Sequence, residues 1–140
     1  MKIMLAVDGS DYTRKMLDYV THNSALFDAS HEYMVFNAQP PLPPHARSVI
    51  GSAAAQDYHL EEAQKVITPA VAALQAKGLR VTGEWRVGHP GEAIAQFAES
   101  GKFDMLIMGT HGHGALARLV MGSVTSQVLA HCGVPVLLIR

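Results

Sequence analysis

Hydrophobic residues occur along the chain in short, nearly unbroken runs that are separated by longer amphipathic stretches. Three of these runs cover residues 2–7, 103–108 and 134–139. Because they are almost continuously apolar, they predict strands that are buried on both faces of a parallel sheet. Residues 33–38 and 79–87 predict two further strands.

The stretches between these runs predict four helices. Ser10 is placed to cap a first helix that extends to about residue 27. A second helix is indicated by apolar residues three and four positions apart, namely Leu60, Ala63, Ile67, Ala70 and Leu74. Pro69 lies inside this stretch and predicts a kink. A third helix follows Pro90 and ends at Gly101, and a fourth begins with Ser123 as its N-cap.

The alternation of strands and helices predicts an α/β fold, an open sheet of five parallel strands with helices on both faces. The length of 140 residues fits one domain, residues 1–140. The long connection at residues 39–56 contains four prolines and predicts a stiff surface loop, or alternatively a flap over a neighbouring site.

Charge and composition limit the kinds of binding partner and the cellular location that we expect. A formal net charge of −1 gives no reason to expect nucleic acid or a membrane surface as the main partner. Only five apolar residues lie between Lys2 and Asp8, too few for a signal peptide, so we expect a cytoplasmic protein. Cys132 is the single cysteine, which excludes an internal disulfide and a cysteine-based zinc site, and we expect it to be buried.

Candidate chemistry is concentrated in residues 109–123, which read GTHGHGALARLVMGS. Gly112, Gly114 and Ala117 match the dinucleotide pattern G-x-G-x-x-A. That pattern requires a first strand before it and an acidic residue after it, but here it follows the fourth strand and no Asp or Glu occurs after Asp104. No lysine follows Lys102, which excludes a Walker A loop.

Three interpretations of this segment remain: a metal site, a phosphate-binding loop, and a surface loop whose glycines only form turns. His111 and His113 could share a metal ion, but no further ligand is spaced to complete a zinc site. The glycines instead allow backbone N–H groups to approach a ligand, and Gly122 and Ser123 begin a helix whose unpaired amides attract anions. Arg118 adds a positive charge that no acid opposes. This pattern favours a phosphate chain as the ligand.

Asp8 is expected beside this segment, because the carboxyl ends of parallel strands meet at one edge of the sheet. Its carboxylate could accept hydrogen bonds from ribose hydroxyls or hold a Mg²⁺ ion shared with phosphates. Alternatively, it stabilises the start of the first helix. The sequence does not separate these roles.

The whole chain resembles the universal stress proteins of the UspA superfamily. The segments MLAVDGSDYTRKML, VFNAQPPLP and GVPVLLIR resemble the opening strand and helix, the second strand and the closing strand of that family. Gly109, Gly112, Gly122 and Ser123 match, without gaps, the G-2x-G-9x-G-[ST] motif of its ATP-binding branch. The resemblance implies strand order 3-2-1-4-5, ATP or AMP as the ligand, and a homodimer that acts as a stress-response sensor or regulator.

The resemblance also implies twelve nucleotide-binding positions. They are Val7, Asp8, Ala38, Met108, Gly109, His111, Gly112, His113, Gly122, Ser123, Val124 and Thr125. Asp8 would contact the ribose or a Mg²⁺ ion, and Ala38 would meet the adenine through its backbone. The site offers no lysine and only Arg118, so ATP hydrolysis is expected to be slow or absent. A weak ATPase and a nucleotide-independent interaction protein are the alternatives.

The predicted last strand, residues 134–139, suggests how two chains could form a dimer. Its apolar residues are Val134, Val136, Leu137, Leu138 and Ile139. A strand of this kind at a sheet edge leaves backbone groups open to pairing. The sequence therefore predicts an antiparallel dimer through this strand, unless the first or fourth helix covers the edge.

Overall fold

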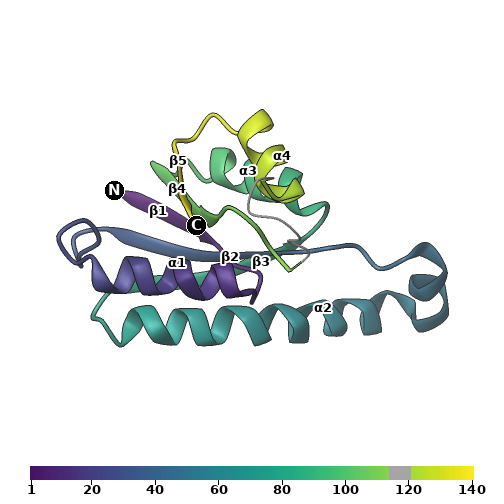
Figure 1. Cartoon of the computed structure of the whole chain (residues 1–140). Helices are drawn as coiled ribbons and strands as arrows, with labels where there is room; N and C mark the ends of the chain where they lie inside the picture. The colour runs from purple at the N-terminus through teal and green to yellow at the C-terminus, as the bar shows by residue number, and fades with distance from the viewer. Residues whose placement is uncertain (114–120) are drawn as a thin grey trace.

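The computed structural model describes residues 1–113 and 121–140, and it shows a five-stranded parallel sheet flanked by helices (Figure 1). The elements follow one another as β1 (Lys2–Ala6), α1 (Asp11–His22), β2 (Glu32–Gln39), α2 (Pro44–Gln75), β3 (Arg80–Val87), α3 (Pro90–Ser100), β4 (Met105–Gly109), α4 (Ser123–His131) and β5 (Val136–Ile139). The strand order is β3-β2-β1-β4-β5, which confirms the predicted fold class and topology.

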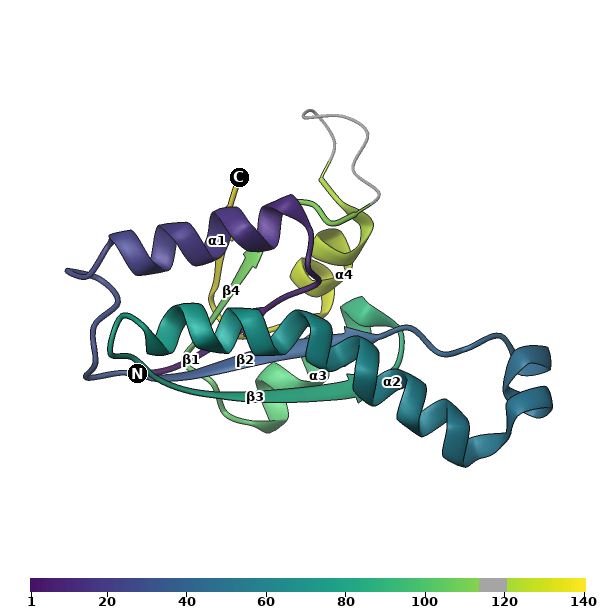
Figure 2. The ribbon, with the colours of Figure 1, turned by 90° about the horizontal axis from the view of Figure 1, so that it is seen from below.

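Two apolar clusters fill the space on the two faces of the sheet. Alternate residues of β1 divide between them, because successive side chains of a strand point to opposite faces. Ile3 and Leu5 belong to the cluster that also contains buried residues of α1 and α2, whereas Met4 belongs to the cluster with α3 and α4. Figures 1 and 2 show the corresponding layers, with α1 and α2 on one side of the sheet and α3 and α4 on the other.

The central strands β1 and β4 mark the point where the strand order reverses. Leu5 of β1 lies opposite Val35 of β2 on one side and Ile107 of β4 on the other. From β1 the sheet continues through β2 to β3, and from β4 it continues to β5. In open parallel sheets, ligands bind beyond the carboxyl ends of the strands at such a reversal.

The first helix has the predicted cap but ends earlier than predicted. The Ser10 hydroxyl accepts a hydrogen bond from the backbone N–H of Thr13, which confirms the cap. The helix stops at His22 rather than near residue 27. The amides of Leu26 and Phe27 both donate to the carbonyl of Asn23, so the chain forms a tight turn that buries the Phe27 ring.

The prediction of a loop at residues 39–56 is wrong, because α2 already begins at Pro44. Proline is tolerated in a first helical turn, where its missing N–H has no intrahelical partner, and residues 45–56 include four alanines, the strongest helix former. The helix is interrupted at Gly51, whose φ of 83° lies in the left-handed region, while helical torsion angles continue through Pro69. The start of α2 projects beyond the sheet (Figures 1 and 2).

Two smaller features of the C-terminal part also differ from the prediction. Gly122 rather than Ser123 is the N-cap of α4, and Ser123 is its first helical residue. Cys132, expected to be buried, is partly exposed. In the parts of the chain that the structure describes, no helix combines the length and the apolar character needed to cross a membrane.

Candidate functional site

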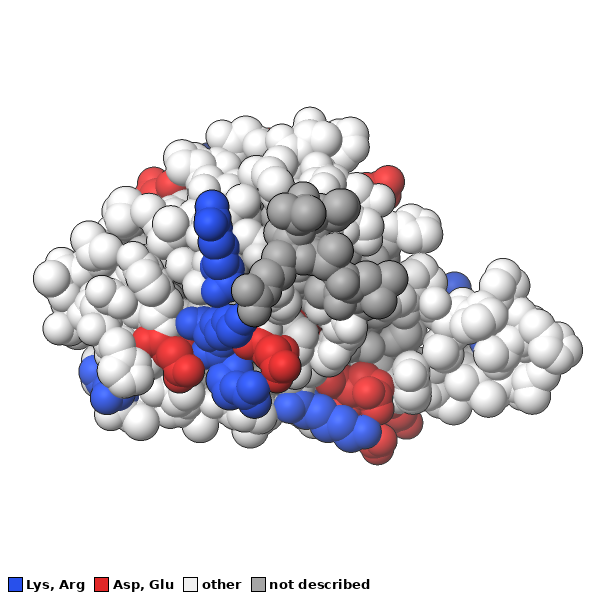
Figure 3. Space-filling view, viewed as in Figure 1, with Lys and Arg blue, Asp and Glu red and all other residues white. Residues whose placement is uncertain are grey.

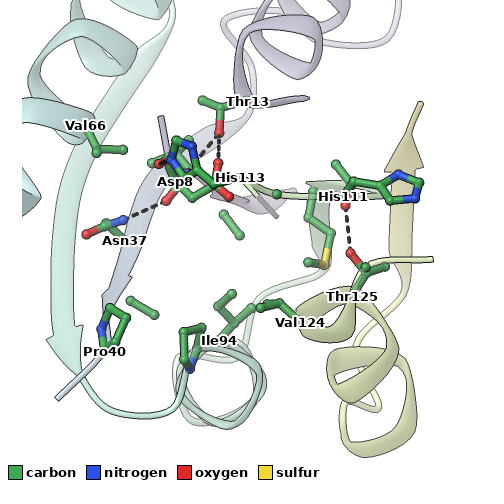
Figure 4. Close-up of a pocket in the computed structure, with 18 of the residues that line it drawn as sticks. Asp8, Thr13, Asn37, Pro40, Val66, Ile94, His111, His113, Val124 and Thr125 are labelled. Atoms are coloured by element: carbon green, nitrogen blue, oxygen red, sulfur yellow. Dashed lines mark hydrogen bonds between the residues drawn. The ribbon is translucent and has the colours of Figure 1, made fainter. Parts of the chain in front are cut away.

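A cavity of about 480 Å³ lies at the carboxyl ends of β1, β2 and β4, where the strand order reverses (Figure 4). All twelve positions that the sequence analysis singled out line it. They come from the turn after β1, the end of β2, the loop after β4 and the start of α4. The fold therefore brings together residues that lie more than a hundred positions apart in the sequence.

The carboxylate of Asp8 is held by the start of α1. Its Oδ1 accepts hydrogen bonds from the backbone N–H of Ser10 and from the hydroxyl of Thr13, each at 2.9 Å. The backbone N–H of Asp8 in turn donates to Thr13 Oγ1 at 2.9 Å. Among the described residues, none donates to Asp8 Oδ2. One oxygen thus serves the helix start, and the other is available as an acceptor in the cavity.

Three motif glycines allow segments of the site to pack closely against one another. A Cβ added to Gly109 would lie 2.7 Å from Tyr12 Cβ, and one added to Gly112 would lie 2.6 Å from Asp8 Oδ2. At Gly122 the added atom would lie 3.1 Å from the Cα of His111. From the sequence, these glycines are expected to allow the close approach of a ligand. The structure adds that the protein's own segments pack closely at these positions, so that an added Cβ would displace a neighbouring group.

The two histidines of the glycine segment have separate partners. His113 Nε2 lies 2.6 Å from the backbone carbonyl oxygen of Asp8, and since a carbonyl only accepts, Nε2 carries the proton (Figure 4). His111 Nδ1 lies 2.9 Å from Thr110 Oγ1, and its ring lies 5.0 Å from that of Tyr12. Within residues 1–113 and 121–140, no three His, Cys, Asp or Glu side chains are grouped to hold a metal ion.

Three residues considered in the sequence analysis, Gly114, Ala117 and Arg118, lie outside the described residues.

The start of α4 presents backbone amides at the cavity. Gly122 is anchored by its N–H, which donates to the carbonyl of Thr110 at 2.9 Å, and it has no side chain to cap the first turn. Ser123, Val124 and Thr125 follow it in the cavity lining. The unpaired amides of a first helical turn carry a partial positive charge that favours an anion. The Thr125 hydroxyl instead donates to the carbonyl of Gly109 at 2.9 Å, which ties the helix to β4.

Further lining residues were not singled out from the sequence. They are Ala6, Thr13, Asn37, Gln39, Pro40, Glu62, Val66, Pro90 and Ile94. Five of the nine are apolar, and α2 and α3 each contribute some of them: Val66 of α2 lies across the cavity from α4, whereas Ile94 of α3 lies beside Val124 (Figure 4). The contributions of α2 and α3 depend on how those helices pack, which the sequence does not state.

The described lining of the cavity carries acidic side chains but no lysine or arginine to bind an anion. Its two carboxylates are those of Asp8 and Glu62. Glu62 accepts a hydrogen bond from Lys65 at 2.8 Å, which raises the pKa of Lys65. In Figure 3, basic and acidic side chains are interspersed over the α1 and α2 side of the molecule, and few charges lie over α3 and α4. An anionic ligand would therefore depend on local amides.

Comparison with known proteins gives the family. Residues 1–140 match the model of the universal stress protein family. The chain belongs to this family. A universal stress protein of Thermus aquaticus is 33% identical over 99% of the chain and 97% of its own length. One from Synechocystis is 34% identical over 99% of the chain, which spans only 42% of that relative.

Solved structures agree with this assignment. The protein MJ0577 of Methanocaldococcus jannaschii superposes with a TM-score of 0.82 and 26% identity, over 99% of the chain and 94% of its own. At 23% identity and a TM-score of 0.71, the universal stress protein of Archaeoglobus fulgidus in complex with dAMP shares the fold over 100% of the chain and 98% of its own. A universal stress protein family member of Arabidopsis thaliana with AMP bound also shares the fold. It has 17% sequence identity and a TM-score of 0.70, over 99% of the chain and 90% of its own.

Proposed function

We propose that this universal stress protein binds an adenine nucleotide, ATP or AMP, in the cavity and acts as a stress-response sensor or regulator. The observation that carries the proposal is the layout of the cavity. An apolar wall at the end of β2 and the uncapped start of α4 lie on opposite sides, with Asp8 Oδ2 available at its edge. The solved relatives with dAMP and AMP support it.

Each part of a nucleotide has a matching part of the cavity. The base fits beside Ala38, Val66 and Ile94, because a flat aromatic ring is best desolvated against apolar side chains. The phosphates are assigned to backbone amides, those around Gly112 and those of the first turn of α4. The ribose between them comes within reach of Asp8.

Asp8 Oδ2 also suits a Mg²⁺ ion that is shared with the phosphates. Mg²⁺ prefers oxygen ligands and usually takes one or two carboxylates together with phosphate oxygens and water. When bound, the ion would neutralise phosphate charge that the described lining residues leave unopposed. A ribose contact and a Mg²⁺ contact differ in one measurable respect: only the latter makes nucleotide affinity depend on Mg²⁺.

We expect binding rather than rapid turnover. Phosphoryl transfer requires strong charge stabilisation and a positioned nucleophile. The described lining residues offer two carboxylates, two histidines and no lysine or arginine. Hydrolysis should therefore be slow or absent, and a weak ATPase is the alternative function at this site.

The sensor is proposed to be a homodimer that pairs through β5. This strand is an edge of the sheet, with β4 as its neighbour on the inner side. An unpaired edge of apolar residues favours pairing with a second chain. Light scattering at micromolar concentration should show twice the monomer mass, and a stable monomer would contradict the proposal. The cytoplasmic location expected from the sequence stays a prediction.

Calorimetry with AMP and ATP, in the presence and absence of Mg²⁺, tests the proposed function. We expect saturable binding that Asp8→Ala weakens by about tenfold or more, because a charged hydrogen-bond partner is lost. Asp57→Ala, at an exposed position of α2, is the matched control and should bind like the wild type. Absence of binding by either nucleotide would favour the alternative of a nucleotide-independent interaction protein.

A further inference from the structure

Two side-chain amides at the end of β2 form a hydrogen-bonded pair beside the apolar wall of the cavity. Asn37 Nδ2 donates to the backbone carbonyl of Val7 at 2.8 Å, and Gln39 Nε2 donates to Asn37 Oδ1 at 2.6 Å. Both residues line the cavity, and Asn37 is only 3% exposed. The pair links the end of β2 to the end of β1.

The orientation of both amides follows from the chemistry of their partners. The Val7 carbonyl can only accept, so Asn37 must present its NH₂ group there and its oxygen toward Gln39. Gln39 must then present its own NH₂ group to that oxygen. The Gln39 Oε1 is left as an acceptor, and no described residue donates to it.

This acceptor lies at the end of the cavity suited to a base. Gln39 is a lining residue, and in the chain it lies between Asn37 and Pro40 at the end of β2. Figure 4 shows Asn37 and Pro40 on one side of the cavity and His111 and Thr125 on the other. A nucleotide whose phosphates meet α4 therefore directs its base toward the β2 end.

We propose that Gln39, oriented by Asn37, selects purines that carry a 6-amino group over purines that carry a 6-oxo group. The inference rests on the proposed nucleotide site. A 6-amino group donates to Gln39 Oε1, whereas a 6-oxo group places two acceptors against each other. Gln39 does not turn its amide to suit the second base, because turning breaks its hydrogen bond with Asn37.

Calorimetry with AMP and IMP tests this selection, since the two ligands differ only in the base. The wild type should bind AMP at least about tenfold more tightly than IMP, and Gln39→Leu should reduce that ratio by about fivefold to tenfold. Asn37→Ala should reduce it as well, because Gln39 is then free to turn. Gln64→Leu makes the same substitution at an exposed position of α2 outside this cavity and should leave the ratio unchanged.

The outcomes separate this inference from the function on which it rests. If the wild type binds AMP and IMP equally well, or if Gln39→Leu keeps the full preference, the selection by Gln39 is wrong while the nucleotide site stands. If the wild type binds neither ligand, the proposed function itself is overturned.

Discussion

The imidazole of His113 donates a 2.6 Å hydrogen bond to the backbone carbonyl of Asp8, 105 positions earlier in the chain. The bond ties the loop after β4 to the turn after β1, the two segments between which we place the ribose and phosphates. A loop held in this way loses less conformational freedom when a ligand binds.

His113→Ala should therefore weaken AMP binding by about threefold to tenfold, because the free loop must be ordered on binding. Calorimetry measures the change. His45→Ala, at an exposed position at the start of α2, is the matched control. An unchanged or tighter affinity in the His113 variant would show that the hydrogen bond does not prepare the site.

Gly112 is a second position where the site tolerates little change. A methyl group there would lie 2.6 Å from Asp8 Oδ2, so Gly112→Ala must displace the carboxylate or the loop. We expect AMP affinity to fall by at least about tenfold, since a displacement of about 1 Å is sufficient to spoil such a site.

Gly88→Ala is the matched control for this substitution, because its added atom would meet Ala93 Cβ at an ordinary 3.5 Å. Calorimetry on both variants, with circular dichroism to confirm folding, gives the comparison. Equal affinities for AMP in the two variants would contradict the close packing of Gly112 against Asp8.

His59 is a buried polar side chain without a visible role. It is 4% exposed, and its Nδ1 has no hydrogen-bond partner among the described residues. Leaving a buried polar group unpaired costs about 1–3 kcal/mol. His59→Leu should therefore maintain or raise the free energy of unfolding, by up to about 2 kcal/mol, in urea denaturation. A clear loss of stability would reveal a partner for this imidazole.

Tyr33 predicts a pH dependence of stability in alkali. Burial of its side chain, and to a lesser extent the charge of Asp28, raises its pKa from 10.0 to about 12. Because the folded-state pKa is the higher one, the contribution to stability is complete below pH 10 and is lost between pH 10 and about 12. The free energy of unfolding, measured across this pH range, should fall more steeply for the wild type than for Tyr33→Phe. Equal slopes would contradict the assignment.

Much of the fold could be predicted because buried strands are visible in the sequence as short apolar runs. Strands buried on both faces require nearly continuous apolar runs, and such runs lie within or beside the inner strands β1 and β4 and the edge strand β5. The edge strand β3 was also predicted, although its residues are mixed in polarity and largely exposed. The beginning of α2 was missed because four prolines suggested a loop, whereas three of them precede the helix, the third as its N-cap, and Pro44 occupies its first turn. Proline limits a helix only where an interior N–H is needed.

The candidate site was predicted in part for the same kind of reason. Glycine spacing marks places of close approach, so the positions from Gly109 to Gly122 could be recognised along the chain. The amide pair of Asn37 and Gln39 and the wall residue Val66 could not, because their roles depend on which side chains meet across separate elements. The same holds for the pairing of Asp8 with Thr13, which occupies one carboxylate oxygen and leaves the other available.

The most direct measurement of the central claim is a titration of the isotope-labelled protein with AMP, followed through its backbone amide resonances by NMR. The account predicts saturable shifts that are largest at Gly112, at the first turn of α4 from Ser123 to Thr125, and at Ala38 and Gln39. Absence of shifts at millimolar AMP, or shifts confined to the outer face of α2 and β3 around Trp85, would contradict it.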